Sequence, residues 1–155
     1  MLYFIDTNIF LRVLVKENEK IFKDCQQFLN LIRQNKIKAF TSTIILSEID
    51  WVLESFYKFP KERVIEGLSS ILKLKNLKIK DEFNSHLALE IYEKFPIKFI
   101  DALIASNLQI FQKKAIIVSY DRDFDRIGLK RVEPKAIESK RISSSSSLSP
   151  KGFRN

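Results

Sequence analysis

The sequence has little of what several common kinds of functional site require. Only three of its 155 residues are glycines, and none lies in a GxGxxG or GxxxxGK[ST] arrangement, so phosphate-binding loops built on close backbone approach are excluded. His86 is the only histidine, which excludes a histidine-rich zinc site, and we expect it on the surface. Cys25 is the only cysteine, so no internal disulfide can form, and we interpret it as a small apolar packing residue. The chemistry must come from other side chains.

Long apolar runs are also missing. No uncharged run reaches the roughly 18 residues that a membrane-spanning helix needs. Asp6 interrupts the apolar N-terminal stretch, and no basic residue precedes it, which argues against a signal peptide. Together with the single cysteine, this predicts a cytoplasmic protein without membrane contact.

Basic residues outnumber acidic ones. Lys and Arg number 27 against 19 Asp and Glu, which gives a net charge of +8. Residues 140–155 hold four basic side chains and no acidic one, so half of this net charge lies there. Such a balance suits a polyanion such as nucleic acid, and it equally suits a lysine-rich surface that keeps the protein soluble.

Apolar periodicity predicts alternating strands and helices. The expected strands lie at 2–5, 37–40, 77–80, 115–118 and around 130–132, and the expected helices at 9–15, 19–34, 43–57, 60–74, 81–94 and 98–113. Ser42 or Thr43 is expected to cap the helix at 43–57, and Asp81 the helix at 81–94. This order favours an α/β domain, a three-layer α/β/α sandwich with a mostly parallel central sheet. We assign it to residues 1–135, followed by a basic, serine-rich C-terminal tail at 136–155 that cannot build a core.

Two acidic residues follow predicted strands. Asp6 ends the first strand, and Asp121 comes just after the strand at 115–118. Ligand sites of parallel sheets gather beyond the carboxyl ends of the strands. For either aspartate taken alone, capping of the turn that follows the strand is the favoured interpretation.

Two further acids interrupt apolar helix faces. Glu48 has only apolar residues three and four positions away, so it lies in the apolar stripe of its helix. Asp101 lies near a helix start and is followed by apolar residues at helical spacing. Carboxylates that face a core are rare unless they are paired or bind metal. A buried salt bridge for Glu48 and a capping role for Asp101 are the alternatives.

Convergence of these four acids predicts a metal site. At an assumed spacing of roughly 6 Å and an effective dielectric constant near 20, each charged pair repels by about 3 kcal/mol. Cations or protons must relieve this repulsion. Mg²⁺ or Mn²⁺ is the natural partner, because both prefer carboxylate oxygen and water.

Four motifs resemble those of PIN domains. They are Leu-Tyr-Phe-Ile-Asp-Thr-Asn at 2–8, Leu-Ser-Glu-Ile-Asp-Trp-Val-Leu at 46–53, Ile-Asp-Ala-Leu-Ile-Ala at 100–105 and Ser-Tyr-Asp-Arg-Asp-Phe at 119–124. Their order and spacing agree with the family over about residues 1–134. The chain is most similar to the VapC toxins of toxin–antitoxin pairs. Ser119 stands where threonine is more frequent, and the serine-rich tail has no counterpart in compact members.

The resemblance implies a fold and an activity. PIN domains carry a parallel sheet between helices, bind one or two Mg²⁺ or Mn²⁺ ions, and cut RNA to leave a 5′-phosphate and a 3′-hydroxyl. VapC toxins usually form homodimers and are held inactive by a VapB-like antitoxin. Most of the thirteen phenylalanines are expected in the core, and some would line a dimer or antitoxin groove.

A role for each candidate residue follows as a hypothesis. Asp6, Asp101 and Asp121 bind the main ion, and Glu48 binds a second ion or orients its water. Asp123 is the alternative or additional ligand to Asp121, with Asp125 close by in sequence. Thr7, Asn8 and Ser119 orient carboxylates or waters. Candidates for holding the RNA backbone are Arg122, Arg126, Lys130 and Arg131, for which a solvated basic turn is the alternative.

Two other functions stay open. The first is another PIN nuclease role, in RNA maturation or structure-specific DNA cleavage. The second is a non-catalytic PIN module that binds RNA or a protein partner. Such modules commonly lose one or more of the acids, whereas all four are present here.

Overall fold

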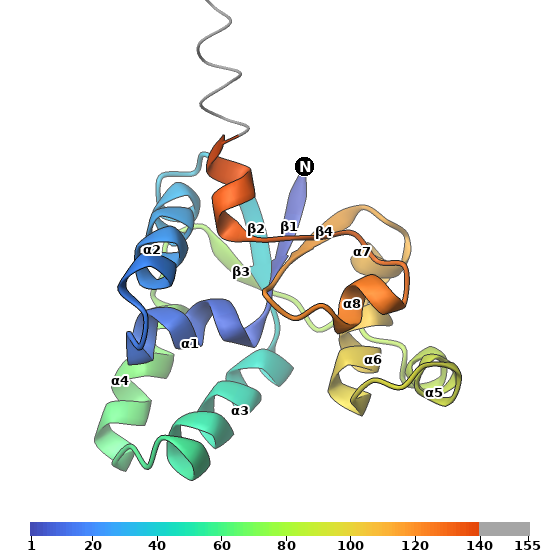
Figure 1. The fold of residues 1–155 in the computed structure, drawn as a ribbon, viewed down its shortest axis with the longest axis horizontal. Helices are drawn as coiled ribbons and strands as arrows, with labels where there is room; N and C mark the ends of the chain where they lie inside the picture. Colours follow the sequence, from blue (N-terminus) through green and yellow to red (C-terminus); the bar gives the residue numbers. More distant parts are fainter. Residues whose placement is uncertain (140–155) are drawn as a thin grey trace, which may run out of the picture.

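The structure, a computed structural model, describes residues 1–139 (Figure 1). Its strands are β1 (Leu2–Ile5), β2 (Lys38–Thr41), β3 (Leu77–Ile79), β4 (Ala115–Val118) and β5 (Arg131–Val132). They form one sheet in the order β3-β2-β1-β4-β5, and every neighbouring pair is parallel. The predicted parallel sheet is confirmed.

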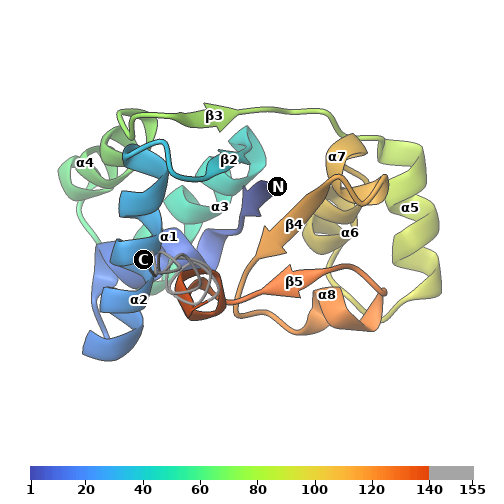
Figure 2. The same ribbon diagram turned by 90° about the horizontal axis from the view of Figure 1, so that it is seen from above.

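Helices cover both faces of the sheet. They are α1 (Thr7–Val15), α2 (Glu19–Arg33), α3 (Thr43–Trp51), α4 (Lys61–Leu72), α5 (Ser85–Lys94), α6 (Phe99–Ala105), α7 (Leu108–Phe111) and α8 (Asp123–Arg126), with a π-helix, η1 (Val52–Phe56), after α3. Seen from above, α1 to α4 gather on one side of the sheet and α5 to α7 on the other (Figure 2). The expected three-layer sandwich is therefore confirmed.

The core lies along the central strands. Phe4 of β1 and Phe40 of β2 are fully buried, and their ring centroids lie 5.3 Å apart at a steep angle. Cys25 is fully buried among apolar side chains, as its packing interpretation predicted. Residues 134–139 form a further helical turn, and Ile137 belongs to the core. The domain thus extends past the predicted boundary at 135, and the rest of the predicted tail, 140–155, lies outside the described residues.

Two predicted helices are each divided in two. The helix expected at 43–57 changes from α to π geometry after Trp51. The helix expected at 98–113 ends at Ala105, and α7 begins after Asn107, whose side-chain oxygen accepts a hydrogen bond from the Gln109 amide. Apolar periodicity continues across both breaks, so it cannot reveal them.

The cap of α3 comes from a distant residue. Ser42 occupies the position before the helix, but its buried hydroxyl has no hydrogen-bond partner among the described residues. Asp81 instead accepts a hydrogen bond from the Thr43 amide at 2.8 Å. The predicted capping of a helix at 81–94 by Asp81 is therefore wrong. The helix there begins at Ser85, with Asn84 as its cap.

This cap predicts a stability difference. Asp81→Ala is expected to lower the free energy of unfolding by about 1 kcal/mol, because it leaves a helix N-terminal amide without its acceptor. Ser42→Ala is the matched control and is expected to be neutral or slightly stabilising, because it removes a buried hydroxyl that has no hydrogen-bond partner in the part of the chain that the structure describes. Urea unfolding of both variants measures the difference. Equal destabilisation by the two substitutions would contradict this assignment.

No helix of residues 1–139 is long and apolar enough to cross a membrane. The cytoplasmic location stays a prediction.

Candidate active site

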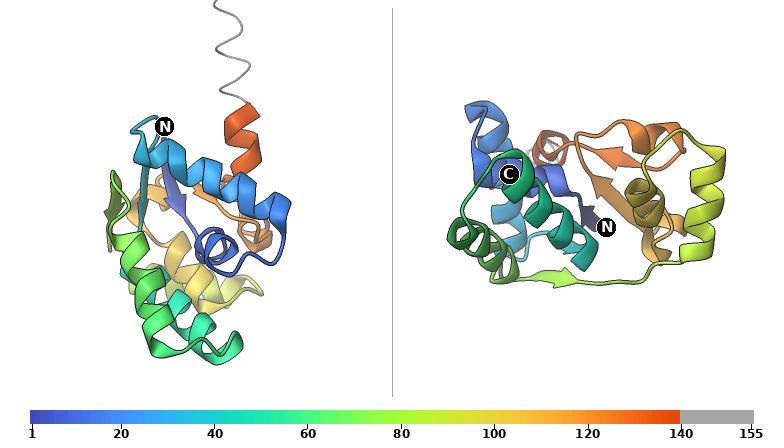
Figure 3. Two further views of the ribbon diagram at one scale, coloured as in Figure 1. Left: turned by 90° about the vertical axis from the view of Figure 1, so that its left-hand side faces the viewer. Right: turned by 90° about the horizontal axis from the view of Figure 1, so that it is seen from below.

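Four acidic side chains meet at the carboxyl-end edge of the sheet. Asp6 follows β1 and Asp121 follows β4, while Glu48 lies on α3 and Asp101 on α6. Seen from below, α3 and α6 stand on either side of this edge (Figure 3). The parallel arrangement of β1 and β4 brings the ends of both strands to one place, although 113 residues separate Asp6 from Ser119.

The most compact group consists of Asp101, Asp121 and Asp123. Each offers a carboxylate oxygen, and these three oxygens all lie within 4.8 Å of one another. Asp101 is only 6% exposed, and its Oδ2 atom has no hydrogen-bond partner within residues 1–139. A buried carboxylate oxygen without a donor is costly, so this atom indicates a place for a bound cation.

Three hydrogen bonds fix the Asp6 carboxylate. The Thr7 amide donates to Oδ1 at 2.8 Å, whereas Asn8 Nδ2 and Ser119 Oγ donate to Oδ2 at 2.7 and 2.6 Å. Asp6 is 5% exposed and ends β1, with its own amide bonded to the Val118 carbonyl of β4. The carboxylate is therefore held in one orientation before any ligand arrives.

Ser119 and Asn8 join the two strand ends. The Ser119 hydroxyl accepts from Asn8 Nδ2 at 2.8 Å and from the Asp121 amide at 2.9 Å. Asn8 Oδ1 accepts from the Tyr120 amide at 3.1 Å. The same side chains thus position Asp6 and shape the backbone that carries Asp121.

Glu48 is positioned by Thr7. The Thr7 hydroxyl donates to Glu48 Oε2, which ties α3 to the first residue of α1. Glu48 also lies close enough to Asp6 and Asp101 to raise the pKa of each. It therefore belongs to the same electrostatic group as the aspartates.

Burial raises the pKa of Asp6 to about 7. The negative charges of Glu48 and Asp101 act in the same direction, and the hydrogen bonds from Ser119 and Thr7 oppose them. Near neutral pH this carboxyl group is thus poised between its protonated and charged forms. A cation in the cluster would favour the charged form.

Burial also raises the pKa of Asp101, to about 6, with the charge of Asp121 as the next cause. Lys98, at the start of α6, opposes this rise. Lys98 was not among the predicted site residues. The only signal for it in the sequence is its place three residues before Asp101.

A model of the PIN domain matches residues 3–130. The chain belongs to the PIN domain family. The VapC ribonuclease of Aquifex aeolicus is 30% identical over 132 residues, which cover 84% of this chain and 95% of that relative. The acidic cluster of this chain therefore lies within a PIN domain, as the four motifs predicted.

Solved structures give the same fold. One is VapBC2 from Rickettsia felis, bound to a DNA fragment from the VapBC2 promoter. It matches this chain with a TM-score of 0.61 and 26% sequence identity, and the match covers 86% of this chain and 98% of that one. VapC20 of Mycobacterium tuberculosis, a Sarcin-Ricin loop cleaving toxin, matches with a TM-score of 0.61 over 86% of this chain and all of that one. At 15% identity, the second likeness supports the fold alone.

The four basic residues predicted to hold RNA have different surroundings in this PIN domain. Arg122 and Lys130 are exposed, and Arg126 is exposed but forms an ion pair with Asp123 at 3.0 Å. Arg131 is different, because its side chain is only 11% exposed.

The Arg131 guanidinium is engaged within the domain. It donates to both Asp125 oxygens at 3.0 to 3.2 Å, to the Ser119 carbonyl at 2.8 Å and to Glu133 at 3.4 Å. We therefore do not propose that Arg131 binds the RNA backbone. Arg131 stabilises the segment after β4 through its hydrogen bond to the Ser119 carbonyl, and Asp125 is its ion-pair partner.

Proposed function

We propose that this chain is a divalent-metal-dependent endoribonuclease of the VapC type. The observation that carries the proposal is the buried Asp101 carboxylate: its Oδ2 atom has no hydrogen-bond donor among residues 1–139, and one of its oxygens lies within 4.8 Å of oxygens of Asp121 and Asp123. The likeness to the VapC ribonuclease of Aquifex aeolicus extends over nearly the whole length of that relative and supports RNA as the substrate.

The donor set fits Mg²⁺ or Mn²⁺. All the candidate ligand atoms are carboxylate oxygens, and the only histidine, His86, is exposed on α5. Asp101, Asp121 and Asp123 would hold one ion, with Asp6 completing the cluster and Glu48 serving a second ion or its water. When bound, such an ion supplies Lewis acidity and neutralises charge at the phosphodiester that is cut.

The other polar residues prepare this arrangement. Asn8 and Ser119 hold Asp6 in one orientation, and Thr7 does the same for Glu48. Because these contacts exist without substrate, little reorganisation is needed when the phosphodiester binds.

Exposed cations would bind the RNA backbone. We assign this role to Lys98, Arg122 and Lys130, each of which is exposed. Arg126 joins them when phosphate displaces Asp123 from its ion pair or when Asp123 turns to a bound cation. The net positive charge of the chain favours such association.

A protein partner is part of the proposal. The similar Rickettsia felis structure contains VapB together with VapC, and we propose that a VapB-like antitoxin binds this chain. We also propose a homodimer, which sedimentation of the purified protein tests. A monomer at micromolar concentration would contradict this part alone.

The test of the function is a cleavage assay on structured RNA. Purified protein is expected to cut RNA in Mn²⁺ or Mg²⁺, to leave 5′-phosphate and 3′-hydroxyl ends, and to be inactive in EDTA. Cleavage of a branched DNA and not of RNA would favour structure-specific DNA cleavage instead. RNA binding without cleavage under every metal condition would favour the non-catalytic module.

A further inference from the structure

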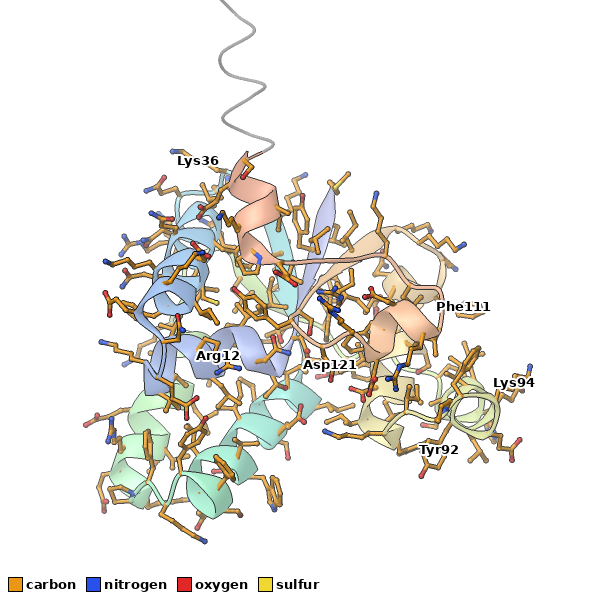
Figure 4. The ribbon with its side chains drawn as sticks, viewed as in Figure 1. Arg12, Lys36, Tyr92, Lys94, Phe111 and Asp121 are labelled. Atoms are coloured by element: carbon orange, nitrogen blue, oxygen red, sulfur yellow. The ribbon has the colours of Figure 1, made fainter. Side chains whose placement is uncertain are left out.

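A pocket adjoins the acidic cluster at Asn8. It has a volume of about 240 Å³ and lies between α1 and the segment that follows α3. Its lining consists of Asn8, Leu11, Arg12, Val15, Glu17, Phe56 and Tyr57. Arg12 lies on the side of α1 that faces α3, Asp121 lies farther toward α8, and Phe111 lies at the opposite end of the view (Figure 4). Asn8 apart, these lining residues have no role in the acidic cluster.

Asn8 connects this pocket to the catalytic acids. Its amide nitrogen donates to Asp6 at 2.7 Å and to Ser119 at 2.8 Å, so one end of the side chain belongs to the acidic cluster. The same residue forms a wall of the pocket. A strand of RNA with its phosphate at the acids would therefore bring a neighbouring nucleotide to this opening.

Two aromatic rings form the outer wall. Phe56 is 72% exposed although it is one of the largest apolar residues, and it packs edge to face on Tyr57 with centroids 4.9 Å apart. Phe56 ends η1, and π-helical turns are frequent at functional sites. An exposed ring that is held by a second ring offers a platform on which a nucleobase can stack.

Charged groups complete the pocket. Arg12 donates to Glu17 at 3.2 Å, and the Glu17 carboxylate lies beside the Tyr57 hydroxyl. Arg12 is only partly exposed, so its aliphatic part lines the pocket while the guanidinium can reach a phosphate oxygen. Glu17 is an acceptor for the N–H groups on the edge of a base. Rings, cation and acceptor together match a nucleotide better than an apolar peptide segment.

We propose that this pocket is a nucleobase-binding subsite for the RNA nucleotide next to the phosphodiester that is cut. The base stacks on Phe56, Glu17 accepts from its edge, and Arg12 holds the adjoining phosphate. This inference rests on the proposed ribonuclease function, and it adds the residues by which the substrate strand is gripped.

The test measures binding without cleavage. In the Asp101→Asn background, fluorescence anisotropy with a labelled 12-nucleotide RNA of random sequence, in Mg²⁺, gives the dissociation constant. A second probe is the same ribose-phosphate chain without bases. Phe56→Ala is expected to weaken binding of the base-bearing RNA about tenfold, from the usual contribution of a base–aromatic stack, and to leave the abasic chain unaffected. Arg12→Ala is expected to weaken the binding of both probes, because both carry the phosphate that Arg12 would hold.

Matched controls lie at the far end of the molecule. Phe111→Ala removes another exposed ring and Lys94→Ala another exposed cation, and both are expected to leave binding unchanged. If Phe56→Ala weakens the binding of both probes equally, or weakens the binding of neither, the proposed subsite is wrong. Unchanged RNA affinity together with lost affinity for a co-purified antitoxin would overturn it too, and would assign the pocket to a protein partner. A wild-type protein that binds RNA in this base-dependent way but never cleaves it would refute the proposed function and keep the subsite.

Discussion

Asp101→Asn is expected to lower the rate of RNA cleavage by at least about 100-fold, by analogy with the loss of other groups that stabilise a transition state electrostatically. The substitution keeps the shape of the side chain and removes the charge of the most buried member of the Asp101, Asp121 and Asp123 group. Its amide nitrogen is a hydrogen-bond donor and cannot serve as a ligand to a cation, and the amide oxygen that remains is an uncharged and weaker ligand than a carboxylate oxygen. The initial rate of cleavage of a structured RNA in Mn²⁺ measures the effect.

Asp50→Asn is the matched control for this experiment. Asp50 lies on α3 two residues after Glu48, but its side chain is 38% exposed and forms an ion pair with Lys61 at 3.9 Å. We expect Asp50→Asn to cleave RNA at the wild-type rate. If Asp101→Asn retains that rate as well while its circular dichroism spectrum is unchanged, the acidic cluster is not the active site.

The strands and the edge at which the acids meet could be predicted from sequence. A buried parallel strand is apolar on both faces, so β1 and β4 stand out as unbroken runs that end beside Asp6 and Asp121. Glu48 and Asp101 stand out because each places a charge in an apolar helix face. These signals depend only on residues that are close together in the sequence, so a single sequence is enough to recognise them.

Contacts between distant segments could not be predicted in this way. Asp81 caps α3 from 38 residues away, although its place before an apolar run is equally typical of a local cap. Arg131 resembles its basic neighbours in sequence, and only the fold turns it toward Asp125 and the Ser119 carbonyl. The pocket at Phe56 depends on how α1 and η1 approach one another, which no periodicity encodes.

Without divalent cations, the cluster is expected to make the protein less stable as the pH rises. Asp6 has an ordinary pKa of 3.8 and a pKa of about 7 in the folded protein, and that of Asp101 rises from 3.8 to about 6. Below pH 3.8 both groups are protonated in the folded and unfolded states, so neither opposes folding. Between the two pKa values the unfolded chain releases its proton more readily, and the folded state loses about 1.4 kcal/mol per pH unit for each group.

Comparison with Asp101→Asn isolates this contribution from the rest of the titration. Urea unfolding in EDTA at pH 5 and pH 8 measures the free energy of unfolding of both proteins. The stability of the variant relative to the wild type is expected to be about 1–2 kcal/mol greater at pH 8 than at pH 5, because asparagine carries no charge at either pH. The two acids are coupled, so their separate contributions do not simply add.

Mg²⁺ is expected to reverse the difference at pH 8. A cation that binds only the folded state, at about 100 times its dissociation constant, stabilises that state by about 2.7 kcal/mol. The wild type is expected to gain this stability, whereas Asp101→Asn gains much less because an uncharged amide replaces a carboxylate ligand. Parallel pH profiles of the two proteins, together with equal responses to Mg²⁺, would mean that Asp101 neither carries a strained charge nor takes part in holding an ion. The electrostatic repulsion that destabilises the cation-free protein and the affinity for the ion have one origin, so both effects should disappear together.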